Sequence, residues 1–383
     1  MILSNVNNTP LRPFEPSVID CLGEISAAIL TSPVGRQFPD LTAFAFYIRK
    51  ANLHKLQELL HLEEGRLGRG LCFHIAPANI PVNFAFSWVF SLLAGNANIV
   101  RLPSKEFPQV DALLGIVKKI IEKYPEIQAR NAFVRYPRTD NETTAAYCQM
   151  ADCRMIWGGD RTIASIKALP AKPRCVDIAF ADRYSVALIN GEAVLAADET
   201  RFMRLIEGFY NDTYLMDQNA CSSPQVILWE NDSPAARTRF WTAVEVLAQK
   251  KYKLQDAVAV DKYTLLCEES VKNSAVQRFT RAGNLLYRAE LSALPDDLVV
   301  HRGKGGFFFE YSLRGREEFF RLVTEKFQTI TQFGIDADEL RRQIVERGLR
   351  GIDRIVPIGQ AMNIGVIWDG HDLIRELSRI LSV

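Results

Sequence analysis

The alternation of short apolar runs with amphipathic stretches over residues 71–189 is the feature that most constrains the fold of this chain. Each apolar run is short enough for a strand, and the segments between the runs repeat their apolar residues at helical spacing. Such β-α alternation is typical of a mostly parallel sheet with helices on both faces. We therefore predict an α/β fold with strands at residues 71–75, 98–102, 132–136, 153–157, 175–179 and 185–189.

The loops that follow these strands are the expected place for ligands, because ligands in a parallel α/β sheet bind at the carboxyl ends of the strands. The loops at 76–81, 103–106 and 158–160 all fall there. The segment 82–94 is apolar on nearly every side, which indicates a helix packed between layers, and Gly95-Asn96 supplies its C-terminal stop.

The length of 383 residues is too great for one simple core and suits two domains. A helix over about 200–210 leads into a polar turn at 214–223. A second strand–helix set then begins, with a strand at 224–229 and a helix at 233–250 capped by Ser233. We place the domain change near residue 213.

Composition argues against several classes of partner. Lys and Arg number 46 and Asp and Glu 45, so no field of one sign draws the chain to nucleic acid or an anionic membrane. The most apolar window is too short to span a bilayer, and the N-terminus lacks the pattern of a secretory signal. Seven cysteines without a CxxC pair or zinc spacing suit reduced thiols in a cytoplasmic protein and no metal site.

Cys221 is the strongest candidate for chemistry. It lies in a small polar turn just before the apolar run 224–229, so its thiol can stand at the lip of a cleft with a rigid strand behind it. Covalent catalysis at sulfur needs such a nucleophile, with backbone N–H groups nearby to hold an oxyanion. The alternative is a cysteine that only fills space in the core, as most do.

Asn79 is a candidate oxyanion donor. It lies in the loop 76–81, where two prolines stiffen the backbone and aim the amide. In other enzymes such a donor lowers the barrier by roughly 3–4 kcal/mol. The alternative, that Asn79 bonds to loop backbone groups, is equally consistent with the segment.

Two further loops offer contacts for a nucleotide. Arg101 and Ser104 end a predicted strand and suit a ribose or its phosphate, although the segment alone favours a solvated turn. Gly158, Gly159 and Asp160 open a helix, and glycines there let a phosphate approach its N-terminus. The spacing is not that of the GxGxxG fingerprint.

Lesser candidates lie further along the chain. His301 stands in the glycine-rich basic loop 300–306, which could contact phosphates, although a mobile hairpin is favoured, and Glu310 lies just beyond it. Cys148 and Cys153 are expected to pack in the core.

Five motifs in order between about residues 70 and 230 resemble the aldehyde dehydrogenase superfamily. They are 77–81, 91–96, 99–104, 158–160 and 218–221. The closer resemblance is to its acyl-CoA reductase branch, the LuxC-like fatty acid reductases. That likeness is carried by residues 74–81, 92–100, 217–225 and 351–357.

The resemblance implies an aldehyde-dehydrogenase-like fold. N-terminal helices and a Rossmann-like nucleotide-binding domain would span 1–213, an α/β catalytic domain 214–360, and a C-terminal segment 361–383 would return to the first domain. It implies reduction of an acyl thioester, acyl-CoA or acyl-protein, to an aldehyde through an S-acyl intermediate on Cys221. Asn79 would hold the oxyanion, and NADPH, with NADH as the alternative, would bind at Ala76, Pro77, Arg101, Ser104, Gly158, Gly159 and Asp160.

One departure from the superfamily pattern bears on the reaction. Hydrolytic aldehyde dehydrogenases carry a general-base glutamate where the alignment puts Ala179. A base that activates water would hydrolyse the acyl-enzyme, so its absence fits an enzyme that keeps the thioester until hydride arrives. The resemblance also implies a LuxE-like acyl-protein synthetase as donor and a homo-oligomer. Two rivals stay open: an aldehyde-oxidising NAD(P) dehydrogenase, and a non-catalytic acyl-carrying subunit.

Overall fold

The computed structural model describes residues 6–77 and 80–382, and the chain divides into two compact units. The first unit comprises the chain up to residue 181 together with 364–383, and the second comprises 182–363. The division falls after residue 181 and not near 213, because the strand and helix between these points pair and pack with the second unit.

The first unit begins with helices that cover one face of its sheet. A proline in the first turn starts three of them, where its missing N–H costs no hydrogen bond. Their buried residues, such as Ile25 and Phe44, join the core beneath the sheet. The helices are α1 (Pro16–Thr31), α2 (Pro33–Gln37), α3 (Pro39–Tyr47) and α4 (Lys50–Leu60).

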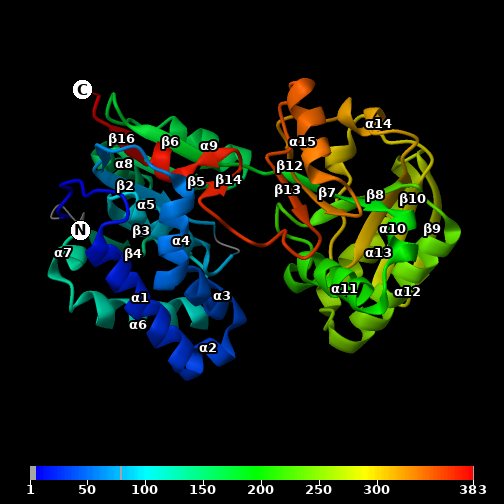
Figure 1. Ribbon diagram of the computed structural model, residues 1–383, viewed down its shortest axis with the longest axis horizontal. Helices are drawn as coiled ribbons and strands as arrows, with labels where there is room; N and C mark the ends of the chain where they lie inside the picture. The colour runs from blue at the N-terminus through cyan, green and yellow to red at the C-terminus, as the bar shows by residue number, and fades with distance from the viewer. Residues whose placement is uncertain (1–5, 78–79, 383) are drawn as a thin grey trace. The chain divides into compact units, whose positions relative to one another are not determined.

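The sheet of the first unit has five strands, all parallel, as the sequence predicts (Figure 1). Their order is β4 (Asn131–Val134), β3 (Ala97–Arg101), β2 (Leu71–Ile75), β5 (Cys153–Trp157) and β6 (Val176–Phe180). The core on one face includes α5 (Asn83–Leu93), α6 (Pro108–Ile121) and part of α7 (Pro125–Gln128), while that on the other includes α8 (Asn141–Met150) and α9 (Asp160–Lys167).

The C-terminal segment completes the first unit. Strand β1 (Arg66–Gly68) pairs antiparallel with β16 (Ser378–Ile380), and the side chain of Asn96 donates to the Leu377 carbonyl at 2.9 Å. Leu373 and Leu377 are buried in the same core as the N-terminal helices. The other elements of the segment are β14 (Ile367–Trp368), β15 (His371–Asp372) and α16 (Leu373–Glu376).

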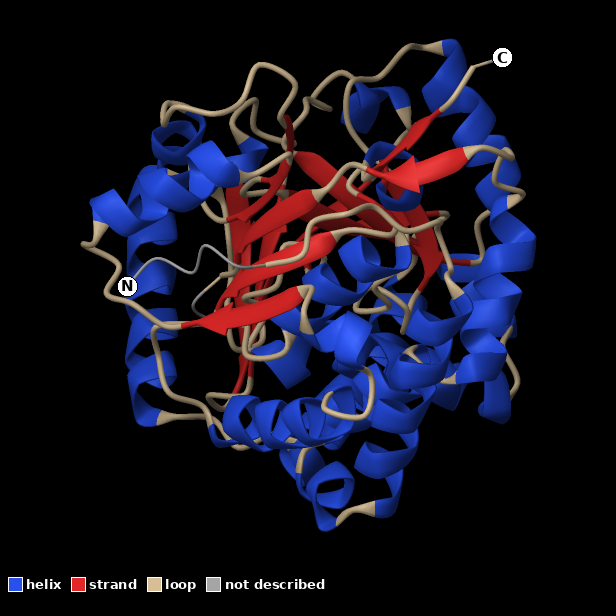
Figure 2. Cartoon of the chain, turned by 90° about the vertical axis from the view of Figure 1, so that its left-hand side faces the viewer, coloured by secondary structure: helices blue, strands red, loops and turns tan. Residues whose placement is uncertain are grey.

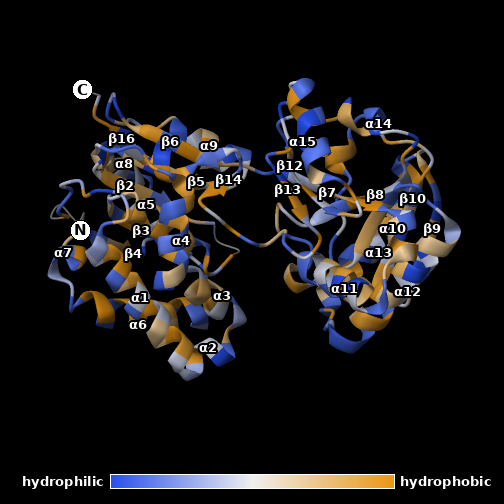
Figure 3. Ribbon diagram, in the orientation of Figure 1, coloured by the Kyte–Doolittle hydropathy of each residue, from blue (hydrophilic) through white to orange (hydrophobic). Residues whose placement is uncertain are grey.

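The second unit is built on a seven-stranded sheet, parallel except for one edge strand, β9, which runs antiparallel to β10. Figure 3 shows its central strands as hydrophobic, which fits a sheet covered on both faces. The order is β13 (Arg354–Pro357), β12 (Phe327–Phe333), β7 (Tyr184–Asn190), β8 (Pro224–Glu230), β11 (Phe307–Ser312), β10 (Leu286–Leu291) and β9 (Val276–Ala282).

Helices cover both faces of this sheet as well. In Figure 2 the first unit faces the viewer, and its strands (red) lie among helices (blue). The Ser233 hydroxyl accepts a hydrogen bond from the N–H of Ala236 at 3.2 Å, so the expected helix cap is present. The helical elements are α10 (Gly191–Ala196), α11 (Glu199–Thr213), η1 (Tyr214–Met216), α12 (Pro234–Lys251), α13 (Asp256–Lys272), η2 (Leu298–Val300), α14 (Glu317–Phe320) and α15 (Ala337–Glu346).

Candidate active site

The turn that carries Cys221 has an unusual backbone. After the single 3-10 turn η1, Asp217 and Gln218 both adopt left-handed conformations, with φ of 50° and 58°. Such conformations are uncommon outside glycine and cost of order 1–3 kcal/mol each, so they persist only where surrounding contacts hold them. The turn ends where β8 begins at Pro224.

Gln218 supplies those contacts. Its side chain is buried, and its Oε1 accepts hydrogen bonds from the N–H groups of Gly306 at 2.8 Å and Phe307 at 3.1 Å. Its Nε2 donates to the Phe307 carbonyl at 3.0 Å. The turn is therefore fixed to the start of the neighbouring strand β11.

Cys221 is half-buried, and its backbone is held from behind. Its carbonyl accepts from the Ser185 hydroxyl at 2.6 Å, and that hydroxyl accepts in turn from the N–H of Thr329 at 3.2 Å. None of the seven cysteines, all of which lie in the described ranges, forms a disulfide. Cys148 and Cys153 are buried in the core, as expected.

Cys221 lines a cavity of about 380 Å³ within the second unit, which we call the nucleophile hollow. Its wall comes from residues 182–183, the Cys221 turn, helix α13 and residues 302–304. The first, second and last of these segments precede β7, β8 and β11. The hollow is thus at the amino ends of parallel strands, whereas the sequence-based rule places ligands at the carboxyl ends.

The cations in this wall are each engaged by a carboxylate. Arg302 makes a two-pronged pair with Asp182, at 2.9 and 3.0 Å. Lys304 pairs with Asp261, and Arg183 pairs with Asp353 in the same unit. The hollow is consequently rich in charge and close to neutral in balance.

Two buried ionisable residues attach α13 to the body of the unit. Lys262 donates to the carbonyls of Asn284 at 2.6 Å and Gly305 at 2.7 Å, and burial lowers its pKa to about 7. His301 pairs with Glu269 at 2.9 Å, and this hydrogen bond raises the pKa of the histidine. His301 is thus buried against α13, and the expected mobile hairpin is instead an ordered wall.

The residues expected to bind the nucleotide lie at the carboxyl edge of the five-stranded sheet. Ala76 and Pro77 are half-buried at the end of β2, while Asn79 lies outside the described residues. Arg101 stacks over the Tyr136 ring at 4.5 Å, and Ser104 is exposed in the bend after β3.

The geometry of this edge fits a dinucleotide. Strand β2 lies between β3 and β5. From β2 the chain continues to β3 and β4 on one side, and it then crosses to β5 and β6 on the other side. The loops after β2 and β5 therefore flank the point where the strand order reverses, which is where such folds bind nucleotides. Arg101 ends β3 and Gly158 follows the end of β5, on either side of β2. The N-cap residue of α9 is Gly159, which has no side chain to cap the helix, and the Asp160 carboxylate next to it suits a ribose hydroxyl better than a phosphate.

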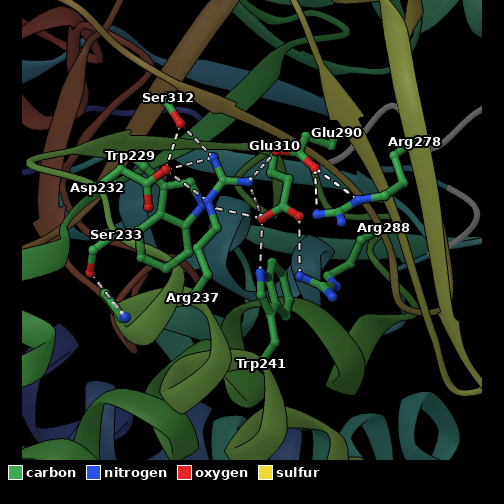
Figure 4. A network of polar contacts seen from close by, with 11 residues as sticks. Trp229, Asp232, Ser233, Arg237, Trp241, Arg278, Arg288, Glu290, Glu310 and Ser312 are labelled. Atoms are coloured by element: carbon green, nitrogen blue, oxygen red, sulfur yellow. Dashed lines mark hydrogen bonds and ion pairs between the residues drawn. The ribbon is translucent and has the colours of Figure 1, made fainter.

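A second cavity of about 500 Å³, the arginine hollow, lies by the other ends of strands β8 and β11 (Figure 4). Glu310, which bonds to residues that line this cavity, is 2% exposed and accepts from the indole N–H of Trp241 at 2.9 Å and of Trp229 at 3.3 Å. Arg288 bonds to it at 3.2 Å, and Arg237 lies 3.6 Å away. Glu310 therefore belongs to a structural network and not to the glycine-rich loop.

Helix α13 contributes wall residues of the nucleophile hollow that the sequence analysis missed. Asp261, Thr264 and Glu268 line it. A signal was available, because the buried side chains of α13, every residue of which is described, are the ionisable Lys262 and Glu269. A helix with ionisable residues on its buried side is a candidate wall of a polar site.

Two absences hold for residues 6–77 and 80–382. No group of three or more His, Cys, Asp or Glu side chains is placed to hold a metal ion. No helix in these ranges is both long and apolar enough to cross a membrane.

Comparison with known proteins identifies relatives at two levels. The family model for acyl-CoA reductases of the LuxC type matches residues 54–284, more than half of the chain. None of the curated proteins matches the sequence significantly.

Solved structures show the fold of aldehyde dehydrogenases. Aldehyde dehydrogenase 21 from Physcomitrella patens superposes with a TM-score of 0.64 at 12% identity, over 95% of this chain and 85% of that one. A bifunctional proline utilization A protein gives 0.63 at 14% identity, and the Bradyrhizobium japonicum protein gives 0.64 at 14%. In both, 95% of this chain spans only 42% of the other.

Proposed function

The chain belongs to the LuxC family of acyl-CoA reductases, and on that premise we propose that it reduces an acyl thioester to an aldehyde through an S-acyl intermediate on Cys221. Family and fold make it an oxidoreductase of acyl or aldehyde groups that uses a nicotinamide cofactor. The choice of NADPH over NADH, the thioester route and the role of each residue belong to the proposal.

The observation that carries the proposal is the setting of Cys221. Cys221 is half-buried and lines a hollow, its carbonyl is held by Ser185, and Gln218 fixes the turn that carries it. A nucleophile held in this way keeps its orientation while a substrate carbonyl approaches, which supports covalent catalysis.

The first step transfers the acyl group. The Cys221 sulfur forms a bond to the carbonyl carbon, the bond from that carbon to the carrier sulfur breaks, and the carrier leaves as a thiol with the proton from Cys221. The backbone N–H of Cys221 and the side chain of Asn79 would hold the oxyanion in this step.

The second step releases the aldehyde. The reduced nicotinamide dinucleotide supplies a hydride to the acyl carbon when it is bound. The C–S bond to Cys221 then breaks, and the sulfur takes up a proton to restore the thiol. Residues at the carboxyl edge of the first unit's sheet would hold the dinucleotide: Ala76, Pro77, Arg101, Ser104, Gly158, Gly159 and Asp160.

The proposed donor is acyl-CoA or an acyl-protein, which a LuxE-like synthetase would supply. Assembly as a homo-oligomer is part of the same proposal. Both rest on the family to which the chain belongs.

Oxidation of free aldehyde is the second candidate function, and one observation favours it. Glu268 lines the same hollow as Cys221, at 3.5 Å from Lys272, and could activate water although Ala179 occupies the expected base position. An acyl-enzyme that hydrolyses rapidly without cofactor, and slowly after Glu268→Gln, would favour this function. A long-lived acyl-enzyme favours the reductase.

Intact-mass spectrometry tests the proposal directly. The protein is mixed with a panel of acyl-CoAs of different chain length, before and after addition of NADPH or NADH. We expect one acyl adduct per chain that disappears as aldehyde forms, faster with NADPH. Cys221→Ala should form no adduct and lose at least about 10³-fold in acyl-dependent NADPH oxidation.

Cys267→Ala is the matched control, because Cys267 is exposed on α13 and lies outside the hollow. It should keep both the adduct and the rate. An adduct that survives in Cys221→Ala would overturn the assignment of the nucleophile, whereas an adduct that resists both cofactors would favour an acyl-carrying subunit.

A further inference from the structure

The chain crosses between its two units twice, after residue 181 and after residue 363. On the second unit, the first crossing leads into residues 182–183, which we call the entry segment, and the second crossing follows residues 358–363, which we call the exit segment. Domains of one chain move relative to one another by default, through the few residues that link them. How firmly the second unit holds these two segments therefore decides how freely the chain can pivot.

The entry segment is held by two ion pairs. Asp182 accepts two hydrogen bonds from Arg302, at 2.9 and 3.0 Å. Arg183 donates to the Phe327 carbonyl at 2.7 Å and pairs with Asp353. The side chain of Arg183 is only 12% exposed, so its charge is screened less by salt than that of a surface arginine.

The exit segment is held through its backbone. The guanidinium of Arg354 donates to three carbonyls, those of Gln360 at 3.3 Å, Ala361 at 3.0 Å and Asn363 at 3.0 Å. On the other side, the Asp212 carboxylate of α11 accepts from the N–H groups of Gly359 at 2.6 Å and Ala361 at 2.9 Å. The segment is therefore bonded to the second unit up to the last residue before the crossing.

Two consecutive residues hold both segments. Asp353 pairs with the entry segment, and Arg354, the first residue of β13, bonds to the exit segment. The preceding residue, Ile352, has a φ of 65°, which is rare for a β-branched side chain and costs of order 1–3 kcal/mol. Its N–H donates to the Phe327 carbonyl at 2.9 Å, which helps to keep it there. Backbone strain of this kind concentrates at functional positions and points to a role for the residues that follow.

We propose that Asp353 and Arg354, together with Asp212, hold both crossings on the second unit and so restrict the pivoting of the two units during the reaction. This inference rests on the proposed function, which assigns the nucleophile to the second unit and the dinucleotide to the first. Hydride transfer needs closely aligned reactants, and a misplacement of about 1 Å can cost roughly 10²-fold in rate. The three are positioning residues, since they act through the backbone at the crossings.

Arg354→Met removes the bonds to the exit segment, and three reactions at Cys221 measure the effect. Alkylation by iodoacetamide, followed by peptide mass spectrometry, needs the second unit alone and should stay within twofold. Acylation by acyl-CoA, which would draw on Asn79 of the first unit, should slow, and reduction of the preformed acyl-enzyme by NADPH should slow at least about tenfold. An unchanged rate of reduction overturns the proposal, and so does a loss of alkylation by the same factor, because that indicates a defect of the Cys221 turn itself.

Asp212→Asn is the second variant. Burial raises the pKa of Asp212 to about 7, so an amide spares the fold a buried charge, while its single oxygen replaces only one of the two carboxylate acceptors. The variant should therefore fold and show the same pattern of rates, with reduction slowed about threefold or more. Arg341→Met is the matched control, because Arg341 is exposed on α15 and pairs with Asp338, outside both segments. It should keep all three rates.

A distance measurement keeps this inference separate from the proposed function. One spin label is placed on Cys267, which is exposed in the second unit, and the other on Lys119→Cys, at an exposed position of α6 in the first unit. Cys175→Ser and Cys221→Ala remove the other thiols that are not fully buried. Double electron–electron resonance then gives the distribution of distances between the two labels.

The width of this distribution reports the pivoting directly. We expect Arg354→Met to widen it at least twofold and Arg341→Met to leave it unchanged. An unchanged width in Arg354→Met, or in Asp212→Asn should Arg354→Met fail to fold, overturns the inference. A widened distribution in a protein that no thioester acylates overturns the proposed function alone.

Discussion

The two hollows of the second unit lie toward opposite ends of the same parallel strands and use charge in opposite ways. In the arginine hollow, Glu310 gathers two arginines and two indole N–H groups into one continuous network (Figure 4). In the nucleophile hollow, the ion pairs stand separately, and polar atoms of Gln225 and Arg183 stay unsatisfied within the described chain.

The difference separates a network of shared charges from a set of single ion pairs. Orphaned polar atoms occur in both hollows, since Asp232 Oδ1, in the arginine hollow, also finds no hydrogen-bond partner among the described residues. A buried charge is tolerated where several partners satisfy it, and losing one of them is costly. Orphaned donors and acceptors reduce stability unless a ligand completes them. Substitutions in the arginine hollow should therefore change stability, and those around Cys221 should also change the rate.

Glu310→Gln should produce the largest change in stability. It removes the buried partner of Arg237 and Arg288, and breaking such a pair costs about 3–5 kcal/mol. Urea unfolding followed by tryptophan fluorescence measures the loss, with Glu245→Gln, at the partly exposed margin of the same hollow, as a control expected within about 0.5 kcal/mol. Acylation of Cys221 in folded Glu310→Gln should stay within twofold, and a large fall would break the comparison.

Lys262→Met should remove a pH dependence of stability. Burial lowers the pKa of Lys262 to about 7, whereas the unfolded chain titrates near 10.4. Between these values the unfolded state binds the extra proton, so the free energy of unfolding rises with pH, by up to roughly 4 kcal/mol in total. The contribution of Lys262 to the free energy of unfolding is complete above the pKa that lysine has in the unfolded chain, and it is lost as the pH falls to 7.

Urea unfolding at several pH values between 7 and 10 compares the variant with the unaltered protein. The difference between them should grow in favour of the unaltered protein as the pH rises. Lys250→Met, on the exposed end of α12, should show no such trend, and an equal slope in Lys262→Met would contradict the assignment.

Gln218→Met should affect both stability and chemistry. It leaves the N–H groups of Gly306 and Phe307 without their acceptor, at a cost of about 2 kcal/mol, and loosens the turn that carries Cys221. We expect acylation to slow about tenfold. A protonated glutamate at this position can both accept and donate hydrogen bonds, as the amide of Gln218 does. The acylation rate of Gln218→Glu, relative to the unaltered protein, should therefore recover as the pH falls. A purely structural role would leave the acylation of folded Gln218→Met unchanged.

Ser185→Ala should have the smallest effect. It removes the hydroxyl between the Cys221 carbonyl and the N–H of Thr329, at a cost of about 1–2 kcal/mol and a fewfold loss of acylation rate. Ser223→Ala is the matched control, because the Ser223 hydroxyl is equally buried but finds no partner in the described chain. A larger loss in Ser223→Ala than in Ser185→Ala would contradict the role of the hydrogen bond.

The strands of the first unit could be predicted from the sequence. The segments 71–75 and 153–157 are observed at the predicted residues, because each is a short apolar run bounded by glycine or polar residues. The helix 82–94 is observed over Asn83–Leu93 for the same reason. Apolar periodicity is a local property, so it survives into the fold.

The assignment of strands to sheets could not be predicted. Residues 185–189 follow the strand 175–179 after a short loop, yet β7 pairs with β8 and β12 of the other sheet. Both sheets are parallel, so their strands have the same pattern. The nucleophile hollow was hidden for a related reason, since its walls come from 182–183, 261–268 and 302–304, and only long-range pairing brings these segments together.

The pairing of β1 with β16 determines the order in which the chain can finish folding during synthesis. Residues 66–68 leave the ribosome before the second unit, and their partner residues 378–380 leave after it. At usual elongation rates the second unit takes roughly 10–40 s to be made. The core site that receives Leu373 and Leu377 stays uncovered for that time. The first unit is therefore begun first and completed last, and chaperones can bind its exposed apolar surface in the interval.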